Sequence, residues 1–220
     1  MGKLIVIDGL DGSGKATQTD LLFDKLKKTD NNIIKISFPN YDDNSSALVK
    51  MYLSGEFGFS PDSVNAFAAS SFYAVDRYAS YKKYWGEKYL SGYTVICDRY
   101  VTSNLIHQMS KLQKECWKDF INWVEDYEYN KLQLPRPDKI IYLDLDLNIS
   151  QRLIKKRYNS DNLKKDIHEK DISYLKKCQE AARYISKLEN WNVIKCNNEN
   201  DEVYDKEYLN LKILEKIKNI

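Results

Sequence analysis

Five short apolar runs alternate with longer stretches of mixed polarity along the chain. The runs are rich in β-branched residues and lie at Leu4–Asp8, Ile33–Phe38, Thr94–Asp98, Lys139–Asp144 and Asn192–Lys195. Each run is nearly continuous in apolar residues, which is typical of strands that are buried on both faces. The alternation predicts an α/β fold, with a five-stranded parallel sheet and helices on both of its faces.

The stretches between these runs predict the main helices. Ala16 to Lys28 forms an amphipathic pattern, and Ser63–Tyr84 and Lys111–Tyr127 are the longest helical candidates. Pro39 ends the second apolar run, and prolines also precede the fourth. We find no repeat and no linker, so residues 1–220 are expected to form a single domain.

Charge and cysteine content narrow the class of protein. The formal net charge is only +2, which gives no electrostatic reason to expect a nucleic acid or a membrane as partner. No apolar run approaches the roughly 20 residues that span a bilayer. The first strand begins at once and leaves no room for a signal peptide. The four cysteines (Cys97, Cys116, Cys178 and Cys196) are widely spaced, so we expect reduced thiols and a cytoplasmic protein.

A glycine-rich loop follows the first apolar run. Gly9-Leu10-Asp11-Gly12-Ser13-Gly14-Lys15 meets the pattern G-x-x-x-x-G-K between a predicted strand and a predicted helix. The amides of such a loop and the helix N-terminus bind phosphate, and Lys15 supplies a mobile cation. The Ser or Thr that usually follows is Ala16 here, with Thr17 one place later. An ordinary turn is the alternative interpretation.

A second candidate phosphate site follows the third apolar run, at Asp98-Arg99. An acidic residue at the end of a buried strand beside a phosphate loop usually addresses bound Mg²⁺. Arg99 offers a planar fork that suits phosphate oxygens. A local surface ion pair is the alternative, but ligands of such sheets bind beyond the carboxyl ends of the strands, which favours function.

Five segments, in this order, resemble the thymidylate kinase family over nearly the whole chain. They are GLDGSGKAT (Gly9–Thr17), FPNY (Phe38–Tyr41), FYAVDR (Phe72–Arg77), DRYVTSNLIHQ (Asp98–Gln108) and DIHEKD (Asp166–Asp171). The resemblance implies a P-loop kinase fold and transfer of the γ-phosphoryl group of ATP to thymidine monophosphate, for dTTP synthesis. It also implies Mg²⁺ as cofactor, a small mobile lid and, commonly, a homodimer.

The resemblance assigns roles at the phosphate end. The Gly12–Thr17 amides and Lys15 would hold the ATP phosphates. Asp11 would lie near the acceptor nucleotide and help to hold Mg²⁺; a turn-stabilising aspartate is the alternative. Arg99 would bind the acceptor phosphate and bridge toward the γ-phosphate.

The resemblance also assigns an acceptor site. Phe38 and Tyr41 would line it, with Tyr41 bonding to the phosphate. Tyr73 and Arg77 are four residues apart on a predicted helix and share a face, so one ring stacks on a pyrimidine while the guanidinium donates to a carbonyl. The spacing alone is also compatible with a Tyr–Arg pair on a surface helix.

Two further residues bear on the nucleoside. Asn104 matches a position where some family members read the base edge with an amide, although a loop or cap asparagine is the plain alternative. His107 stands where many relatives carry a bulky aromatic residue near C2′ of the sugar. Imidazole is smaller and polar, so the strength of discrimination against a 2′-hydroxyl stays open, and a structural histidine is an equal reading.

A charged stretch at residues 151–171 corresponds to the family's lid. Basic lids of P-loop kinases close over ATP and exclude water, and Arg157 or Lys156 is our candidate for the catalytic cation. Asp166 and Glu169 match a D-x-x-E pattern that joins the magnesium site in some relatives. Because Ala16 has no hydroxyl, we expect Mg²⁺ to be coordinated by Asp98, Asp11 and water. A solvated helix face is the plain reading of this charge run.

Three other functions remain open at this point. A kinase of another pyrimidine monophosphate would share all of the phosphate chemistry. A deoxynucleoside kinase ranks lower, because it needs a carboxylate base near the second strand end, where Ser37–Tyr41 offers none. A non-catalytic nucleotide-binding homologue is disfavoured by Lys15 and Arg99 but kept open by Ala16.

Overall fold

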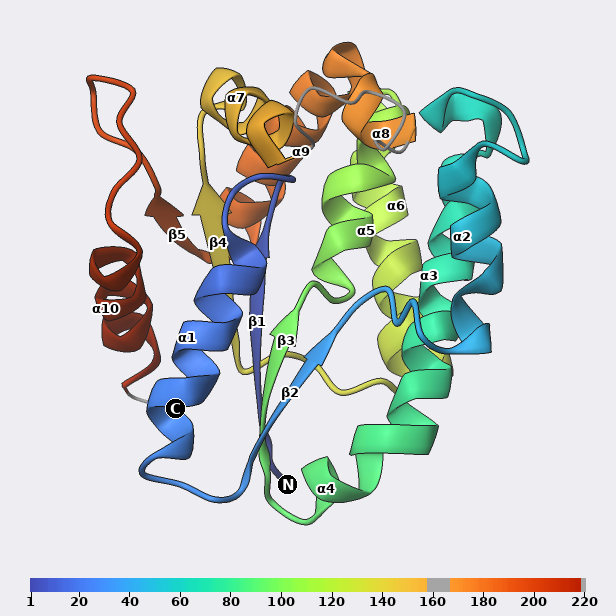
Figure 1. Cartoon of the computed structure of the whole chain (residues 1–220). Helices are drawn as coiled ribbons and strands as arrows, with labels where there is room; N and C mark the ends of the chain where they lie inside the picture. The colour runs from blue at the N-terminus through green and yellow to red at the C-terminus, as the bar shows by residue number, and fades with distance from the viewer. Residues whose placement is uncertain (158–166, 219–220) are drawn as a thin grey trace.

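The computed structural model of the chain describes residues 1–157 and 167–218, apart from the side chains of residues 157 and 170. The predicted sheet is present, with every strand within two residues of its expected ends. Its strands are β1 (Lys3–Gly9), β2 (Ile33–Ser37), β3 (Thr94–Asp98), β4 (Lys139–Asp144) and β5 (Asn192–Lys195). All pairs are parallel and the order is β2-β3-β1-β4-β5, so β1 is central (Figure 1).

Burial differs between central and edge strands. In β1 every residue from Leu4 to Gly9 is buried, as the continuous apolar run predicts. In the edge strands β2 and β5 only Ile33 and Ile194 are buried, and the other residues are partly or fully exposed. The prediction of burial on both faces is therefore correct for the centre of the sheet and too strong for its edges.

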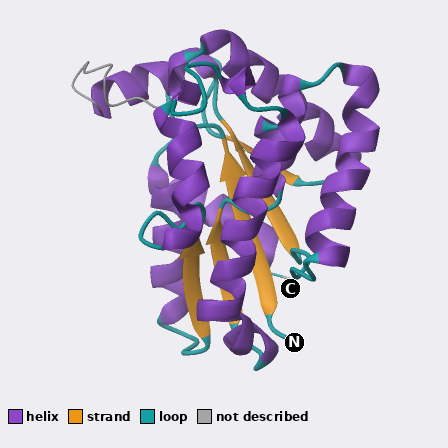
Figure 2. Cartoon of the chain, turned by 90° about the vertical axis from the view of Figure 1, so that its right-hand side faces the viewer, coloured by secondary structure: helices purple, strands orange, loops and turns teal. Residues whose placement is uncertain are grey.

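Helices cover both faces of the sheet, as Figure 2 shows. They are α1 (Lys15–Lys27), α2 (Ala47–Ser54), α3 (Ala66–Ser80), α4 (Gly86–Leu90), α5 (Thr102–His107), α6 (Trp117–Glu125), α7 (Leu147–Arg157), α8 (Ile167–Lys170), α9 (Ile172–Leu188) and α10 (Lys206–Ile217). Successive β1 side chains enter opposite cores: Leu4 and Val6 join the layer of α5, α6 and α9, while Ile5 and Ile7 join that of α1 and α10. Among the described residues, no helix is long and apolar enough to cross a membrane.

Two predicted helices differ from the structure in extent. The stretch expected at residues 63–84 begins only at Ala66, where the side chain of Asn65 accepts from the Ala68 amide at 2.9 Å, and it ends in a π-helical turn, Tyr81–Trp85. For the helix expected at residues 111–127, the predicted start was wrong. Short 3₁₀ turns precede α6, which begins at Trp117 and continues as a π-helical turn, Asp126–Lys131.

The strand register brings the candidate residues to one edge of the sheet. Asp98 ends β3 and lies level with Ile7 of β1 and Ser37 of β2. The loops that follow these three strands therefore leave the sheet side by side. In Figure 1 they meet at the end of the molecule that also carries α7 and α8.

Candidate active site

The glycine loop joins β1 to α1 and has left-handed backbone at two glycines. Gly12 has φ of 81°, and Gly14, the residue before α1, has φ of 86°. A Cβ on Gly12 would also lie 3.0 Å from the Ser150 carbonyl oxygen of α7. Glycine is therefore required at position 12 for its conformation and for the close approach of α7.

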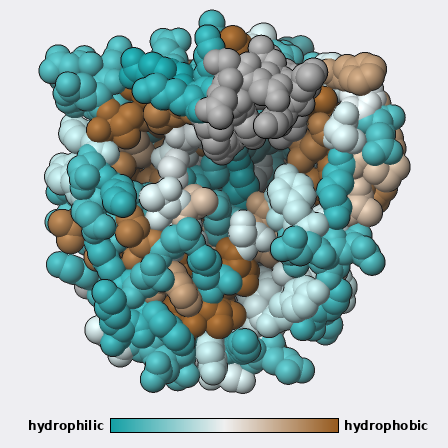
Figure 3. All heavy atoms as spheres, viewed as in Figure 1, coloured by the Kyte–Doolittle hydropathy of each residue, from teal (hydrophilic) through white to brown (hydrophobic). Residues whose placement is uncertain are grey.

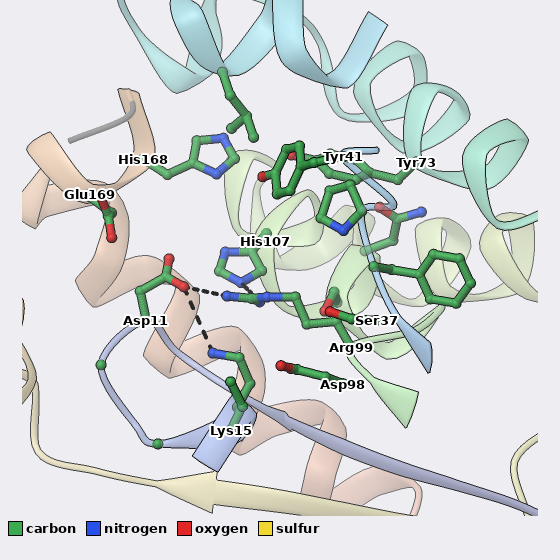
Figure 4. A pocket seen from close by; sticks show the side chains of 18 of the residues that line it. Asp11, Lys15, Ser37, Tyr41, Tyr73, Asp98, Arg99, His107, His168 and Glu169 are labelled. Carbon is green, nitrogen blue, oxygen red and sulfur yellow. Dashed lines mark hydrogen bonds and ion pairs between the residues drawn. The ribbon is translucent and has the colours of Figure 1, made fainter. Parts of the chain in front are cut away.

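Two cations surround one carboxylate at the mouth of this loop (Figure 4). Arg99 donates to Asp11 Oδ1, and the Lys15 ammonium lies 3.8 Å from the same oxygen and donates to the Leu10 carbonyl at 2.9 Å. Burial favours the neutral acid, but the charges of Arg99 and Lys15 outweigh it and hold the pKa of Asp11 well below its usual range. Burial and the nearby Arg99 lower the pKa of Lys15. Arg99 Nη1 also lies 3.8 Å from the buried Asp8 carboxylate, so the two cations are held among several carboxylates.

Arg99 is held in a sparsely populated backbone conformation, with φ of 65°. Its amide donates to the Ile7 carbonyl at 3.0 Å, so the turn after β3 is tied to β1. Behind it, buried Asp8 accepts from Thr102 Oγ1 at 2.6 Å and Ser103 Oγ at 2.8 Å. Backbone strain of this kind is concentrated at functional sites, because the surrounding structure must maintain it.

Asp98, directly before Arg99 at the end of β3, has an unused carboxylate oxygen. Its Oδ1 is buried and has no hydrogen-bond partner among the described residues. Burial raises the pKa of the Asp98 carboxyl, against the opposing charges of Lys15 and Arg99. An orphaned carboxylate oxygen beside a phosphate loop fits a magnesium ion or one of its bound waters.

One cavity of about 590 Å³ connects the predicted site residues. It is lined by Asp11, Gly12, Gly14, Lys15, Ala16, Thr17, Phe38, Tyr41, Tyr73, Arg77, Asp98, Arg99, Asn104, His107 and Glu169, together with residues for which the sequence had suggested no role. Gly9 and Ser13 do not line it; Gly9 packs on Leu143 and Ser13 is buried. The face in Figure 3 is hollowed above its middle, and the residues visible in the hollow are mostly hydrophilic.

The end of the cavity away from the loop is preorganised around Arg77. Tyr73 and Arg77 share one face of α3, as their spacing predicts, and both line the cavity. Arg77 is only 1% exposed, which rules out the surface-pair interpretation. Its Nε and Nη2 donate to the Glu128 carboxylate at 2.6 and 2.7 Å. Burial opposes the charge of this guanidinium, but the charge of Glu128 raises the Arg77 pKa above its usual value.

Asn104 lies inside α5, so it is neither a loop nor a cap residue. Its Nδ2 donates to Glu128 Oε1 at 2.8 Å and to the Ser70 carbonyl at 3.2 Å. Asn104 and Arg77 are therefore joined through one buried carboxylate.

Two stacked imidazoles line the cavity beside the charged cluster, with His107 next to Arg99 (Figure 4). The rings of His107 and His168 are 6.0 Å apart and 10° from parallel. Burial, reinforced by Arg99, holds the pKa of His107 well below its usual value, and burial with the charge of Lys111 lowers the pKa of His168 to about 3. His107 Nε2 lies 3.1 Å from Arg99 Nη1; because a guanidinium only donates, Nε2 accepts and the neutral ring carries its proton on Nδ1.

The lid prediction is tested only at its edges. Asp166 and the Arg157 side chain lie outside the described residues, although Arg157 ends α7. Lys156 is exposed on the same helix. Glu169 of α8 is buried and lines the cavity, close to the glycine loop in Figure 4.

Sequence reasoning missed three residues of this region. Glu128 and Asp8 had no proposed role, and His168 was quoted only within a motif. Asp8 could have been found, because an acidic residue that ends a central apolar run must have buried partners. Glu128 gave no such signal. The segment after β5 lines a separate hollow of about 320 Å³ with Asp144 and Arg183.

Comparison with known proteins identifies relatives along most of the chain. The family model described as Thymidylate kinase matches residues 7–206. A thymidylate kinase of Mycobacterium tuberculosis is 29% identical over 171 residues, which cover 76% of this chain and 78% of that protein. A probable thymidylate kinase of Methanococcus maripaludis is 31% identical over 190 residues, which cover 86% of this chain and 80% of that protein.

Solved structures share the fold. Thymidylate kinase from Candida albicans superposes with a TM-score of 0.71 at 22% sequence identity, covering 99% of this chain and 91% of that one. The enzyme from Ehrlichia chaffeensis superposes with a TM-score of 0.68 at 19% identity and covers 98% of each chain. The predicted P-loop kinase fold is confirmed.

Proposed function

The chain belongs to the thymidylate kinase family, and we infer from this membership that it transfers the γ-phosphoryl group of ATP to thymidine monophosphate (dTMP), giving thymidine diphosphate. One observation carries the assignment to this site: a single cavity joins the cationic glycine loop to a buried arginine–amide end. The two ends suit the two parts of the acceptor, its phosphate and its base.

We propose that the base enters the Arg77 end. Tyr73 would stack on the ring, while Arg77 and Asn104 meet its polar edge. Phe38, a buried residue directly after β2, would close the apolar side. The sugar would then lie beside His107 and His168, because these rings line the same cavity and His107 lies next to Arg99 (Figure 4).

At the other end, the proposal assigns the phosphates to the cations. The amides of Gly12–Thr17 and Lys15 would hold the ATP phosphates, and Arg99 would lie between the two nucleotides with Tyr41 on the acceptor phosphate. Asp11 pairs with both cations in the free protein, so it keeps them in place until phosphate oxygens take over their hydrogen bonds. Arg157 remains our proposed lid cation.

The chemical step needs no general base, because the attacking phosphate oxygen of dTMP is already ionised at neutral pH. Catalysis then consists of aligning two anions and stabilising the charge that moves between them. Lys15 and Arg99 do this with preorganised donors inside a buried site, where electrostatic stabilisation is strongest.

The residues present fit Mg²⁺ as the cofactor. Asp98 offers a buried carboxylate oxygen without a partner among the described residues, and Glu169 adds a second carboxylate in the cavity. We propose Asp98 as the principal ligand, direct or through water, and Asp11, Glu169 and Asp166 as further candidates; the described residues contain no ready-made cluster of three metal-ligating side chains. When bound, the ion neutralises phosphate charge. Ala16 contributes no hydroxyl to it.

We also propose that the protein is a homodimer and is located in the cytoplasm. Apolar side chains of Phe67, Val75 and Tyr78 are exposed along one side of α3, which supports the proposed homodimer. The four cysteines are free thiols, which is consistent with the proposed cytoplasmic location. Size-exclusion chromatography with light scattering measures the oligomeric state.

A coupled assay of ADP release tests the proposed function. With ATP and Mg²⁺, the acceptors are the monophosphates of thymidine, deoxyuridine, uridine and deoxycytidine, plus thymidine itself. A clear preference for dTMP is expected. Preference for another acceptor would overturn the base-site assignment but keep the phosphate chemistry. Absence of turnover with every acceptor would overturn the proposed function.

A further inference from the structure

Glu128 lies behind the base end of the cavity, in the π-helical turn that extends α6. It is 1% exposed and does not line the cavity, so it would not touch a bound nucleotide. We propose that Glu128 is a positioning residue that determines which pyrimidine the kinase accepts. The proposal rests on the proposed function and deepens it, because it names the group that orients the two base-reading side chains.

Each oxygen of the Glu128 carboxylate is occupied. Oε2 accepts from Arg77 Nε at 2.6 Å. Oε1 accepts from Arg77 Nη2 at 2.7 Å and from Asn104 Nδ2 at 2.8 Å. One side chain therefore fixes both the plane of a guanidinium on α3 and the rotation of an amide on α5.

The orientation of the Asn104 amide follows from its partners. Glu128 Oε1 and the Ser70 carbonyl only accept hydrogen bonds, so the group facing them must be the NH₂ of Asn104. Both of its hydrogens are used there. The Asn104 carbonyl oxygen is consequently turned away, and no donor among the described residues reaches it. Because Asn104 lines the cavity, this oxygen is offered to the ligand as an acceptor.

Arg77 complements it as a donor. Its Nε and Nη2 are committed to Glu128, which leaves Nη1 for a ligand, and Arg77 also lines the cavity. A donor beside an acceptor matches the 4-carbonyl and the N3–H of thymine or uracil. Cytosine carries a 4-amino donor and an N3 acceptor, so it is mismatched at both positions. Glu128 thus converts two adaptable side chains into a fixed pattern that rejects cytosine.

Two substitutions test this role. Glu128→Asp keeps the charge that Arg77 needs, but the shorter side chain cannot reach Arg77 and Asn104 together. Glu128→Gln has one acceptor oxygen; with that oxygen on Arg77, its NH₂ faces Asn104 and favours a flipped amide. For both variants we expect the kcat/KM ratio of dTMP to deoxycytidine monophosphate to fall about tenfold or more, the effect of one mispaired buried group.

The kinetic constants that change show whether the loss of selectivity arises at the base end. KM for dTMP should rise while kcat and KM for ATP stay within about threefold, since Glu128 is remote from the phosphate end. Where turnover of deoxycytidine monophosphate is too slow to measure, its inhibition constant against dTMP replaces it. Glu125→Gln is the matched control: this carboxylate ends α6 and pairs with Arg136 at 3.3 Å, and its loss should leave the ratio unchanged.

A double-mutant cycle with Asn104→Ala completes the test. If Glu128 acts on selectivity through Asn104, adding Glu128→Asp to Asn104→Ala should reduce selectivity less than it does alone. Full additivity, or folded Glu128 variants with unchanged selectivity and lower stability only, would overturn the proposal. Glu128→Asp keeps the test informative if Glu128→Gln does not fold. Wild-type protein inactive on every acceptor would instead overturn the proposed function.

Discussion

Two arginines line the same cavity and are held in opposite ways. Arg77 lies on a regular helix, its side chain is 2% exposed, and a buried carboxylate occupies two of its nitrogens. Arg99 lies in a strained turn and its side chain is 18% exposed. It shares Asp11 with Lys15 and lies 3.8 Å from a second carboxylate, Asp8. The first arrangement keeps its partner when a ligand binds. The second suits a cation whose partners are exchanged during the reaction.

The difference follows from what each end must recognise. A base is neutral and is identified by the geometry of its edge, so the reading groups must be fixed and already neutralised. A transferring phosphoryl group is highly charged, so the site must keep cations available to its oxygens. The Arg77 end therefore pairs one cation with one buried carboxylate, whereas the Arg99 end holds two cations, which share Asp11.

Removal of Arg99 should give the largest functional effect. We expect Arg99→Ala to lower kcat about 10³-fold or more, because a preorganised cation on the transferring group is lost. Its free energy of unfolding should change by about 1 kcal/mol or less, since Lys15 still neutralises Asp11 and Asp8 keeps its hydrogen bonds from Thr102 and Ser103. Steady-state kinetics and urea unfolding measure the two quantities. Arg136→Ala, an exposed arginine that pairs with Glu125 and does not line the cavity, is the control and should retain activity. Intact turnover in Arg99→Ala would contradict the assigned role.

Removal of Arg77, in contrast, should give a large loss of stability. We expect Arg77→Met to lower the free energy of unfolding by about 3–5 kcal/mol, because Glu128 stays buried without its counter-charge. The double variant with Glu128→Leu should recover most of this loss, since no unpaired charge remains. Urea unfolding of the two variants gives the answer. If Arg77→Met and Arg99→Ala lose equal stability, the contrast between the two ends is wrong.

The two arginines also differ in how much of their surroundings the sequence could predict. The strands, the glycine loop and Arg99 were found from local patterns, because apolar periodicity and loop chemistry act over a few neighbouring residues. Glu128 was not found, since it is 51 positions from Arg77 and nothing in its π-helical turn distinguishes it from a surface acid. The pairing exists only after α3, α5 and α6 pack together.

Local patterns also left two details open or wrong, because they do not report which elements pack together. The surface interpretation of Tyr73 and Arg77 stayed open because spacing reports a shared face but not what covers it. The start of α6 was misplaced because the 3₁₀ turns before it carry helix-compatible residues. The lid residues Arg157 and Asp166 remain predictions.

Stability should also depend on pH through the histidine pair that lines the cavity. The chain has only two histidines, and both are neutral and buried, with lowered pKa values. Below the unfolded-state pKa of 6.5 the unfolded chain binds protons that the folded one does not, so stability is complete above that pH and falls as pH decreases toward about 3 for His168. The expected slope is about 1.4 kcal/mol per pH unit for each histidine.

Urea unfolding of the nucleotide-free protein between pH 7 and pH 5 measures this slope. His107→Phe should halve it, and replacement of both histidines should remove it. A wild-type protein whose stability does not change over this interval would show that the rings are hydrated and able to ionise, contrary to the burial of both.

The smallest predicted effect concerns Ala16 at the charged end. Ala16 is exposed in the first turn of α1 and lines the cavity, so a larger residue fits there without disturbing either core. Ala16→Thr would add the hydroxyl that usually ligates nucleotide-bound Mg²⁺, and Ala16→Val would add the same bulk without it. We expect the apparent Mg²⁺ constant to fall about threefold in Ala16→Thr alone, the contribution of one weak oxygen ligand. Initial rates over a Mg²⁺ series separate the variants. Identical behaviour of the two would mean that the ion is held by Asp98 and its neighbours without reference to the loop.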